Sequence, residues 1–191
     1  KWLCDICVEE AIAQPEQMTI QNKVLAIDMG LSKLATAVSS NGEVIHLPNK
    51  PKNISVYYGR IIGELQSKQA TKTKYSRTWR YLQRRKRFFF NKKNSQVKDA
   101  LHVQSKRLLD MDHNTIVVGD IQVKKLMEKQ ANKNRKVSRS FGRSNLSMFM
   151  DMLQYKAIAK SVNVVRVNEW NTTQINCLTG KMFDQKVELS D

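Results

Sequence analysis

The sequence has few cysteines and no long apolar run. Its three cysteines, Cys4, Cys7 and Cys177, are an odd number, so a disulfide scaffold is not expected and a reducing, cytoplasmic setting fits better. No segment is long and apolar enough to predict a membrane-spanning helix, and the first residues lack the pattern of a signal peptide. Because residue 1 is Lys rather than Met, we expect the chain to be part of a longer polypeptide.

Acidic residues are also scarce. The chain has 17 Asp and Glu residues against 33 Lys and Arg residues, which gives a formal net charge of +16. Such an excess opposes compaction, because like charges repel, and fold stability therefore does not explain it. The usual reason is a polyanionic partner, and we expect nucleic acid rather than a membrane. The alternative is a surface that is basic without a dedicated partner.

Cys4 and Cys7 have the Cys-x-x-Cys spacing of many zinc sites. Residues 1–9, however, read as a strand, in which side chains three positions apart point to opposite faces. A structural zinc ion needs four ligands, and no second pair lies nearby in the sequence. We therefore expect no structural zinc in this chain.

The distribution of apolar residues predicts strands and helices in a definite order. Residues 23–28 form an apolar run that ends in Asp28, which is typical of a buried central strand. Asn41-Gly42 is a strong hairpin signal between the next two strands. The further predicted elements are strands at 34–40 and 43–47, two long helices within 54–111 that are separated at Asn94-Ser95, a strand at 115–118, a loop at 129–145, an amphipathic helix at 146–157 and a strand at 163–169.

This order describes an antiparallel hairpin sheet followed by parallel strands that are separated by helices. Such a mixed α/β sheet is typical of the ribonuclease-H-like fold, in which the active site lies at strand tips. Acidic residues end the relevant strands here, at Asp28, Asp120 and Glu169. The sequence therefore predicts an acidic site at one end of the sheet, built around Asp28.

One helical segment is strongly basic. No acid occurs between Lys68 and Lys93, and like charges at helical spacing repel each other unless phosphates neutralise them. Aromatic residues alternate with these charges and are suited to base stacking. We expect most of them to pack instead, with Trp79, Leu82 and Phe89 on the core. The predicted nucleic-acid-binding residues are Lys74, Arg77, Arg80, Arg84, Arg85, Arg87, Lys92 and Lys93.

Four segments in order resemble the motifs of TnpB proteins, the insertion-sequence-encoded, RNA-guided relatives of type V CRISPR effectors. Residues 26–36 resemble the first RuvC motif and residues 116–124 the second, while residues 153–157 and 167–174 resemble the stretch that leads into a zinc ribbon. The resemblance implies a RuvC nuclease core that cuts DNA with Mg²⁺ or Mn²⁺. It also implies a guide RNA that selects the target DNA by base pairing.

The resemblance further implies a division of the chain. Residues 1–15 would be the end of an N-terminal wedge-type β domain, and residues 22–175 a RuvC-like nuclease domain with a helical insertion at 54–111. Residues 176–191 would begin a degraded zinc ribbon, because Cys177 stands alone where the family has a pair. The basic helices would then lie against the guide–target duplex.

The acidic residues depart from the family pattern. The second motif usually has Glu where this chain has Gly119, which cannot bind a metal ion. Asp120 lies one residue further, where a strand turns its side chain to the other face. If the strand has already ended there, the Asp120 side chain could instead turn inward and replace the missing acid. We expect Glu169, at the tip of the neighbouring strand, to be the relocated catalytic glutamate, so that Asp28 and Glu169 are the candidate catalytic and metal-binding residues. A third acid is not identifiable, and two-metal hydrolysis needs several carboxylates.

Three functions are consistent with these residues. The first is an RNA-guided, metal-dependent DNA endonuclease, and Glu169 favours it. The second is a nuclease-dead, RNA-guided DNA-binding repressor, which the loss of the acid at Gly119 favours. The third is a ribonuclease-H-like transposase or resolvase that uses no guide RNA.

Overall fold

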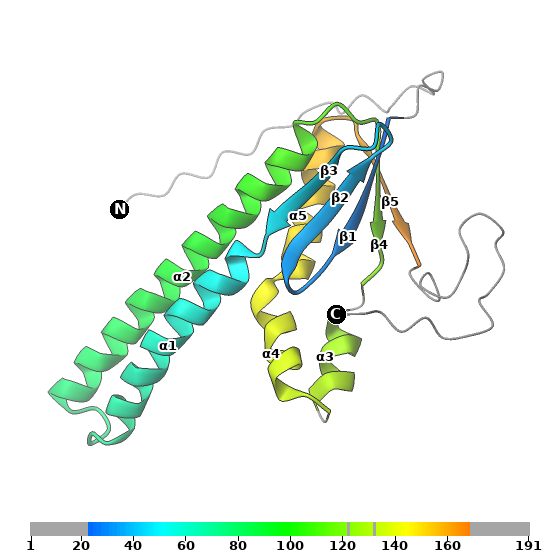
Figure 1. Cartoon of the computed structure of the whole chain (residues 1–191). Helices are drawn as coiled ribbons and strands as arrows, with labels where there is room; N and C mark the ends of the chain where they lie inside the picture. Colours follow the sequence, from blue (N-terminus) through cyan, green and yellow to red (C-terminus); the bar gives the residue numbers. More distant parts are fainter. Residues whose placement is uncertain (1–22, 122, 132, 169–191) are drawn as a thin grey trace.

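The computed structural model describes residues 23–121, 123–131 and 133–168. The strands form one five-stranded sheet. Helices lie against it, and a long helical hairpin projects away from it (Figure 1). The elements in chain order are β1 (Val24–Met29), β2 (Lys33–Ser39), β3 (Val44–Pro48), α1 (Lys50–Ala70), α2 (Arg77–Leu109), β4 (Thr115–Gly119), α3 (Val123–Ala131), α4 (Arg135–Ser144), α5 (Leu146–Ala159) and β5 (Asn163–Val167).

The sheet has the strand order β3-β2-β1-β4-β5. β1 is the central strand, and it pairs antiparallel with β2 and parallel with β4. The hairpin turn between β2 and β3 falls at Asn41-Gly42, and Gly42 has a φ of 86°, which favours glycine. The predicted mixed sheet is confirmed, with its antiparallel half at one edge and its parallel half at the other.

One face of the sheet carries the hydrophobic core. Leu25 and Ile27 of β1 point into the core, and α5 contributes Phe149 and Leu153. All of these except Ile27 are wholly buried. Leu101 and Leu108 from the second half of α2 complete this layer. The intervening strand residues Ala26 and Asp28 are exposed, because successive side chains of a strand alternate between faces. The other face of the sheet is therefore the one that carries Asp28.

The long helices are separated at a different place from the predicted one. Asn94 and Ser95 lie inside α2, and the break lies at residues 71–76. Ser76 begins α2 by accepting a hydrogen bond from the Trp79 backbone nitrogen at 3.2 Å. The packing explains the difference, since Leu82 before Asn94 and Val97 and Leu101 after it are buried, and the half-buried Phe89 lies between them.

The prediction of a loop at residues 129–145 is wrong, because most of this segment belongs to α3 and α4. The Asn134 side chain begins α4 by accepting hydrogen bonds from the backbone nitrogens of Lys136 and Val137, at 3.1 and 3.3 Å. Val137 and Phe141, four positions apart, are both half-buried, and Phe141 packs against the core. The cap and the tertiary contacts of α4 therefore outweigh the polar, basic composition of this segment.

Several predictions concern residues outside the described part of the chain. These are the strand at 1–9, the cysteines, the zinc ribbon and Glu169. Within the described ranges, no helix is long and apolar enough to cross a membrane.

Candidate nucleic-acid and metal site

Asp28 lies near the carboxyl end of the central strand, on the face opposite the core. Its side chain is exposed, whereas Ile27 and Met29 on either side of it are buried. Asp28 pairs with Thr36 of β2, and Thr36 in turn pairs with His46 of β3. On the other side, the parallel register of Ile27 with Val118 places Gly119 beside Asp28 when it is continued by one residue. The predicted position of Asp28 at a strand tip is therefore what the structure shows.

Gly119 and Asp120 follow each other at the end of β4. Gly119 pairs with Val167 of β5, so it belongs to the same cross-strand row as Asp28. The Asp120 backbone nitrogen donates to the Val167 carbonyl oxygen at 2.8 Å, and the ladder therefore continues past Gly119. A residue in such a ladder turns its side chain to the face opposite that of its neighbour. This geometry does not favour Asp120 as the replacement for the missing acid.

The described residues supply only part of a metal site. Among them, no group of three or more His, Cys, Asp and Glu side chains lies close enough together to hold a metal ion. On the face that carries Asp28, the nearest titratable group in its cross-strand row is His46, whose ring nitrogen Nδ1 lies 3.4 Å from Thr36 Oγ1. A carboxylate oxygen is a ligand that divalent cations accept, and Asp28 fits one such position. Glu169 lies outside the described residues, so its role stays a prediction.

A hydrogen-bonded cluster fixes the loop after Asp28 against the start of the helical hairpin. The Leu31 carbonyl oxygen accepts from Asn49 Nδ2 at 3.0 Å and from Lys52 Nζ at 3.1 Å. Asn49 is 4% exposed, begins α1 by accepting from the Lys52 backbone nitrogen, and donates to Ser144 Oγ of α4 at 3.1 Å. One buried amide thus joins the β1–β2 loop, α1 and α4. The hairpin therefore leaves the sheet at the end where the β1–β2 loop follows Asp28 (Figure 1).

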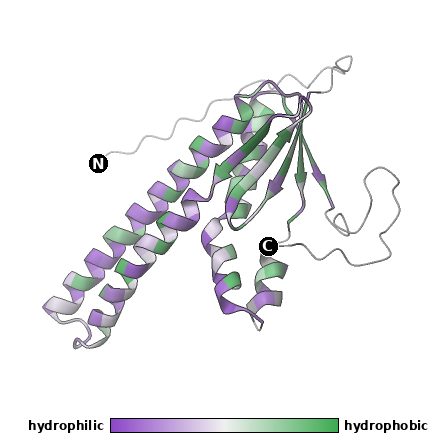
Figure 2. Ribbon diagram, viewed as in Figure 1, coloured by the Kyte–Doolittle hydropathy of each residue, from purple (hydrophilic) through white to green (hydrophobic). Residues whose placement is uncertain are grey.

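The predicted nucleic-acid-binding residues lie on α2 and just before it, along the part of the hairpin that is remote from the sheet. All are exposed except Lys93, which is half-buried with its Nζ 4.3 Å from the centroid of the Phe90 ring. At 3.6 residues per turn, these cations spread around most of the exposed circumference of the helix. Figure 2 shows that the hairpin is largely hydrophilic along this part, while the strands are hydrophobic.

The expectation that most aromatic residues of this segment pack is wrong. Leu82 is buried, and Trp79 and Phe89 are half-buried against α1, as predicted, although they pack within the hairpin and not on the core below the sheet. Four others are 47–60% exposed. The reason is that α1 is the helix that packs on this part of α2, so it covers only one side. The exposed four are Tyr75, Tyr81, Phe88 and Phe90.

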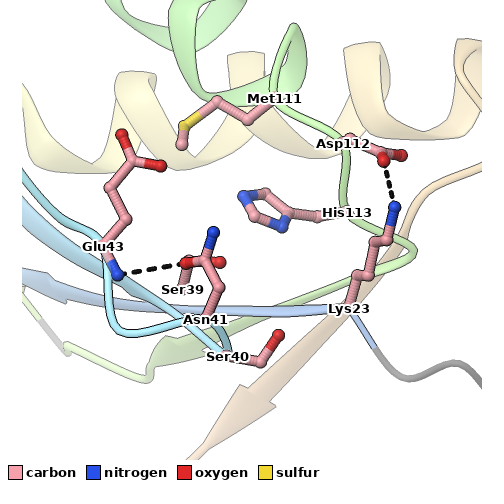
Figure 3. A pocket seen from close by; sticks show the side chains of 8 residues that line it. All are labelled: Lys23, Ser39, Ser40, Asn41, Glu43, Met111, Asp112 and His113. Carbon is pink, nitrogen blue, oxygen red and sulfur yellow. Dashed lines mark hydrogen bonds and ion pairs between the residues drawn. The ribbon is translucent and has the colours of Figure 1, made fainter.

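A pocket of about 380 Å³ lies at the other end of the sheet, where β1 and β4 begin. Figure 3 shows the His113 side chain pointing into it, close to an ion pair between Lys23 and Asp112. Both ring nitrogens of His113 are buried and make no hydrogen bond in the described structure. The pocket is separated from Asp28 by the length of β1, roughly 15 Å at 3.3 Å per residue, so it is not part of the Asp28 site. Sequence reasoning gave no signal for it.

The fold is ribonuclease-H-like, and it carries an exposed acid at the tip of the central strand and a basic helical insertion. Comparison with known families gives the narrower assignment. Residues 5–130 match the OrfB_IS605 family, which is described as a probable transposase, and the chain belongs to that family. This is the family that the four motifs indicated.

Among solved structures, the chain is similar to a protein in the cryo-EM structure of a Cas12f1–sgRNA–target DNA complex. The TM-score is 0.56 and the sequence identity is 10%, with 86% of this chain aligned. The similarity confirms the predicted ribonuclease-H-like fold. The aligned region is 41% of the length of the Cas12f1 chain, so this chain spans less than half of that protein. No curated protein sequence matches.

Proposed function

We propose that this chain is the nuclease portion of an RNA-guided DNA endonuclease, with its metal site built on Asp28 and Glu169. The observation that carries the proposal is the exposed carboxylate of Asp28 at the tip of the central strand, at the end of the sheet from which the basic hairpin projects. A similar fold serves in a protein that binds a guide RNA and a target DNA. A bound Mg²⁺ or Mn²⁺ ion would supply a Lewis acid and an activated water for phosphodiester hydrolysis.

The register of the sheet supports a relocated glutamate. Gly119 lies beside Asp28 and has no side chain, so the row contains a free position between β1 and β5. Residue 169 follows Val167 by two positions, and side chains two positions apart lie on the same face of an extended strand. Neighbouring strands are about 4.8 Å apart. We therefore propose that Glu169 supplies the carboxylate that the family has in its second motif.

A second function is supported by the described residues themselves. They contain no three-ligand group, and two-metal hydrolysis requires several carboxylates. A chain with an incomplete ligand set, a basic hairpin and the same fold would bind DNA under RNA guidance without cutting it, and would act as a repressor.

Cleavage of a plasmid that carries the guided target separates these two functions. In the intact protein with its guide RNA and Mg²⁺, Asp28→Asn should lower the cleavage rate by about a thousandfold, since loss of a metal ligand removes several kcal/mol of transition-state stabilisation. Asp151→Asn, at an exposed acid on α5, is the matched control and should cut normally. Target binding without cleavage in the unsubstituted protein would establish the repressor instead.

A rescue experiment tests Glu169. Glu169→Gln should lose cleavage, and the double variant Gly119→Glu/Glu169→Gln should recover part of it, because the acid returns to the position that the family uses. Circular dichroism spectra must show that each variant is folded. Full cleavage by Glu169→Gln alone would exclude the relocated glutamate while leaving Asp28 in place.

A further inference from the structure

One side of α2 presents aromatic rings and cations in alternation. Five residues at spacings of four, three, four and four lie along one side of the helix, and all five are exposed. The two rings are among the most exposed aromatic side chains in the described structure, at 54% for Tyr81 and 60% for Phe88. We call this set the outer stripe of α2, and it consists of Arg77, Tyr81, Arg84, Phe88 and Lys92.

The outer stripe lies opposite the side of α2 that packs on α1. Leu82 is buried and Trp79 and Phe89 are half-buried on that other side. Phe89 lies 6.4 Å, centroid to centroid, from the buried ring of Tyr58 in α1. The Phe88 ring meets the Phe89 ring edge-on, with the two centroids 5.4 Å apart. Tyr81 and Phe88 nevertheless stay more than half exposed, so both rings present surface to a partner.

The charges of the outer stripe have no acidic partner within the part of the chain that the structure describes. Asp99 is the single acid of α2, seven positions beyond Lys92, and no ion pair among the described residues includes a cation of the stripe. Arg85, beside the stripe, donates to the Tyr81 hydroxyl at 3.1 Å, with its guanidinium carbon 5.9 Å from the Tyr81 ring centroid. This contact orders the ring at the surface. The stripe thus combines an anion-binding surface with a preformed aromatic one.

A surface that combines cations with exposed aromatic rings should bind unpaired nucleic acid more tightly than a duplex. A duplex offers phosphates, but its bases are already stacked, so it would use the cations and leave both rings in water. Unpaired bases stack on aromatic rings with about 1–3 kcal/mol per base, whatever their sequence. Tyr81 and Phe88 are about 10.5 Å apart along the helix axis, at 1.5 Å per residue. Two bases of a single strand held on them would be splayed apart rather than stacked on each other.

We propose that the outer stripe of α2 binds unpaired nucleotides of a single strand, with bases on Tyr81 and Phe88 and phosphates on Arg77, Arg84 and Lys92. The proposal rests on the proposed function only in that the chain binds nucleic acid. It assigns this side of the hairpin to a single strand that is not paired in the guide–target duplex.

Binding of labelled oligonucleotides tests the proposal. The probes are oligouridine, oligothymidine and a blunt duplex of the same length, measured by fluorescence anisotropy over a range of salt concentrations. Tyr81→Leu/Phe88→Leu should weaken binding to the single strands by at least about tenfold and change duplex affinity and the salt dependence little. Comparison of the oligouridine and oligothymidine affinities tells whether the strand is RNA or DNA.

Two further variants complete the test. Arg84→Gln/Lys92→Gln should weaken all three probes, because two phosphate contacts are lost. It should lower the salt slope by about 1.4 for the single strands and about 1.8 for the duplex. Phe90→Leu removes an exposed ring from the same helix but outside the stripe, and it should bind all probes normally.

Three results would overturn the proposal. The leucine double variant could weaken single strands and duplex equally, or weaken neither, and the rings would then take no part in discrimination. It could instead change the unfolding temperature or the elution volume without any nucleic acid, which would identify the stripe as a protein-packing surface. Failure of the unsubstituted chain to bind any probe at low salt is a different result, since it refutes nucleic-acid binding by the chain altogether.

Discussion

The two ends of α2 have different surroundings. Its second half lies under the sheet, where Leu101 and Leu108 are wholly buried between strands and α5. Its first half contacts α1 and carries Tyr81, Arg84 and Phe88 into solvent. One continuous helix therefore has a half that is buried in the core and a half that is largely exposed to solvent. The number of elements that pack on each half makes this difference.

The comparison shows how a charged surface is kept rigid. A helix as basic as the first half of α2 is not expected to be stable alone, because its cations repel one another. Here the second half is fixed in the core, and helix continuity carries that order outward. The charges can thus be presented along an extended hairpin at the cost of few apolar contacts there.

The largest expected effect of substitution is in the core. Phe149→Ala should lower the free energy of unfolding by about 3–5 kcal/mol, because it leaves a cavity among wholly buried side chains. Phe88→Ala, at the same residue type on the hairpin, should change it by less than about 0.5 kcal/mol. Urea denaturation measures both. Equal losses in the two variants would contradict the division between the halves.

The next effect concerns the junction at Asn49. Asn49→Ala should cost about 2 kcal/mol, since it removes the cap of α1 and leaves the buried Ser144 hydroxyl without one of its partners. Asn53→Ala, at an exposed position in the same helix, is the control. A loss below about 0.5 kcal/mol in urea denaturation would show that the sheet and the hairpin are held together by other contacts.

A smaller and more local effect is expected in the hairpin. Gln69 is 6% exposed and connects the two helices by donating to Gln83 Oε1 at 2.9 Å and accepting from Lys86 Nζ at 2.8 Å. Gln69→Leu should cost about 1 kcal/mol. Hydrogen exchange should become faster in the remote part of α1 and α2 and stay unchanged in β1, whereas Gln66→Leu, at an exposed site, should change neither. Faster exchange in β1 would mean that the two regions unfold as one unit.

The smallest effect depends on pH. A hydrogen bond from Lys160 Nζ, which lies 2.5 Å from Asp110 Oδ1, holds the pKa of the Asp110 carboxyl below its usual value of 3.8. Because the pKa is lower in the folded state, this contact stabilises the fold above pH 3.8, and the contribution disappears as the pH falls through the lowered pKa. Lys160→Met should bring the Asp110 pKa back up toward 3.8 in an NMR titration. An unchanged pKa would exclude Lys160 as the cause.

The two ends of the sheet also differ in how far the sequence predicts them. Asp28 was predicted because an apolar run that ends in an acid is a local pattern. The His113 pocket had no such pattern, because it is formed by residues from the start of β1, the β2–β3 turn and the segment before β4. Only the pairing of β1 with β2 and β4 brings these segments together.

The sequence by itself determined the five strands of the sheet, the hairpin at Asn41-Gly42, the core helix predicted at 146–157 and the place of Asp28. Apolar periodicity and turn residues are local, so they can be recognised without tertiary contacts. The tertiary structure decided where the long helices break, that residues 135–144 are helical, and which aromatic rings of α2 face solvent. These features depend on which neighbouring elements cover a given side of a helix, and a linear pattern does not contain that information.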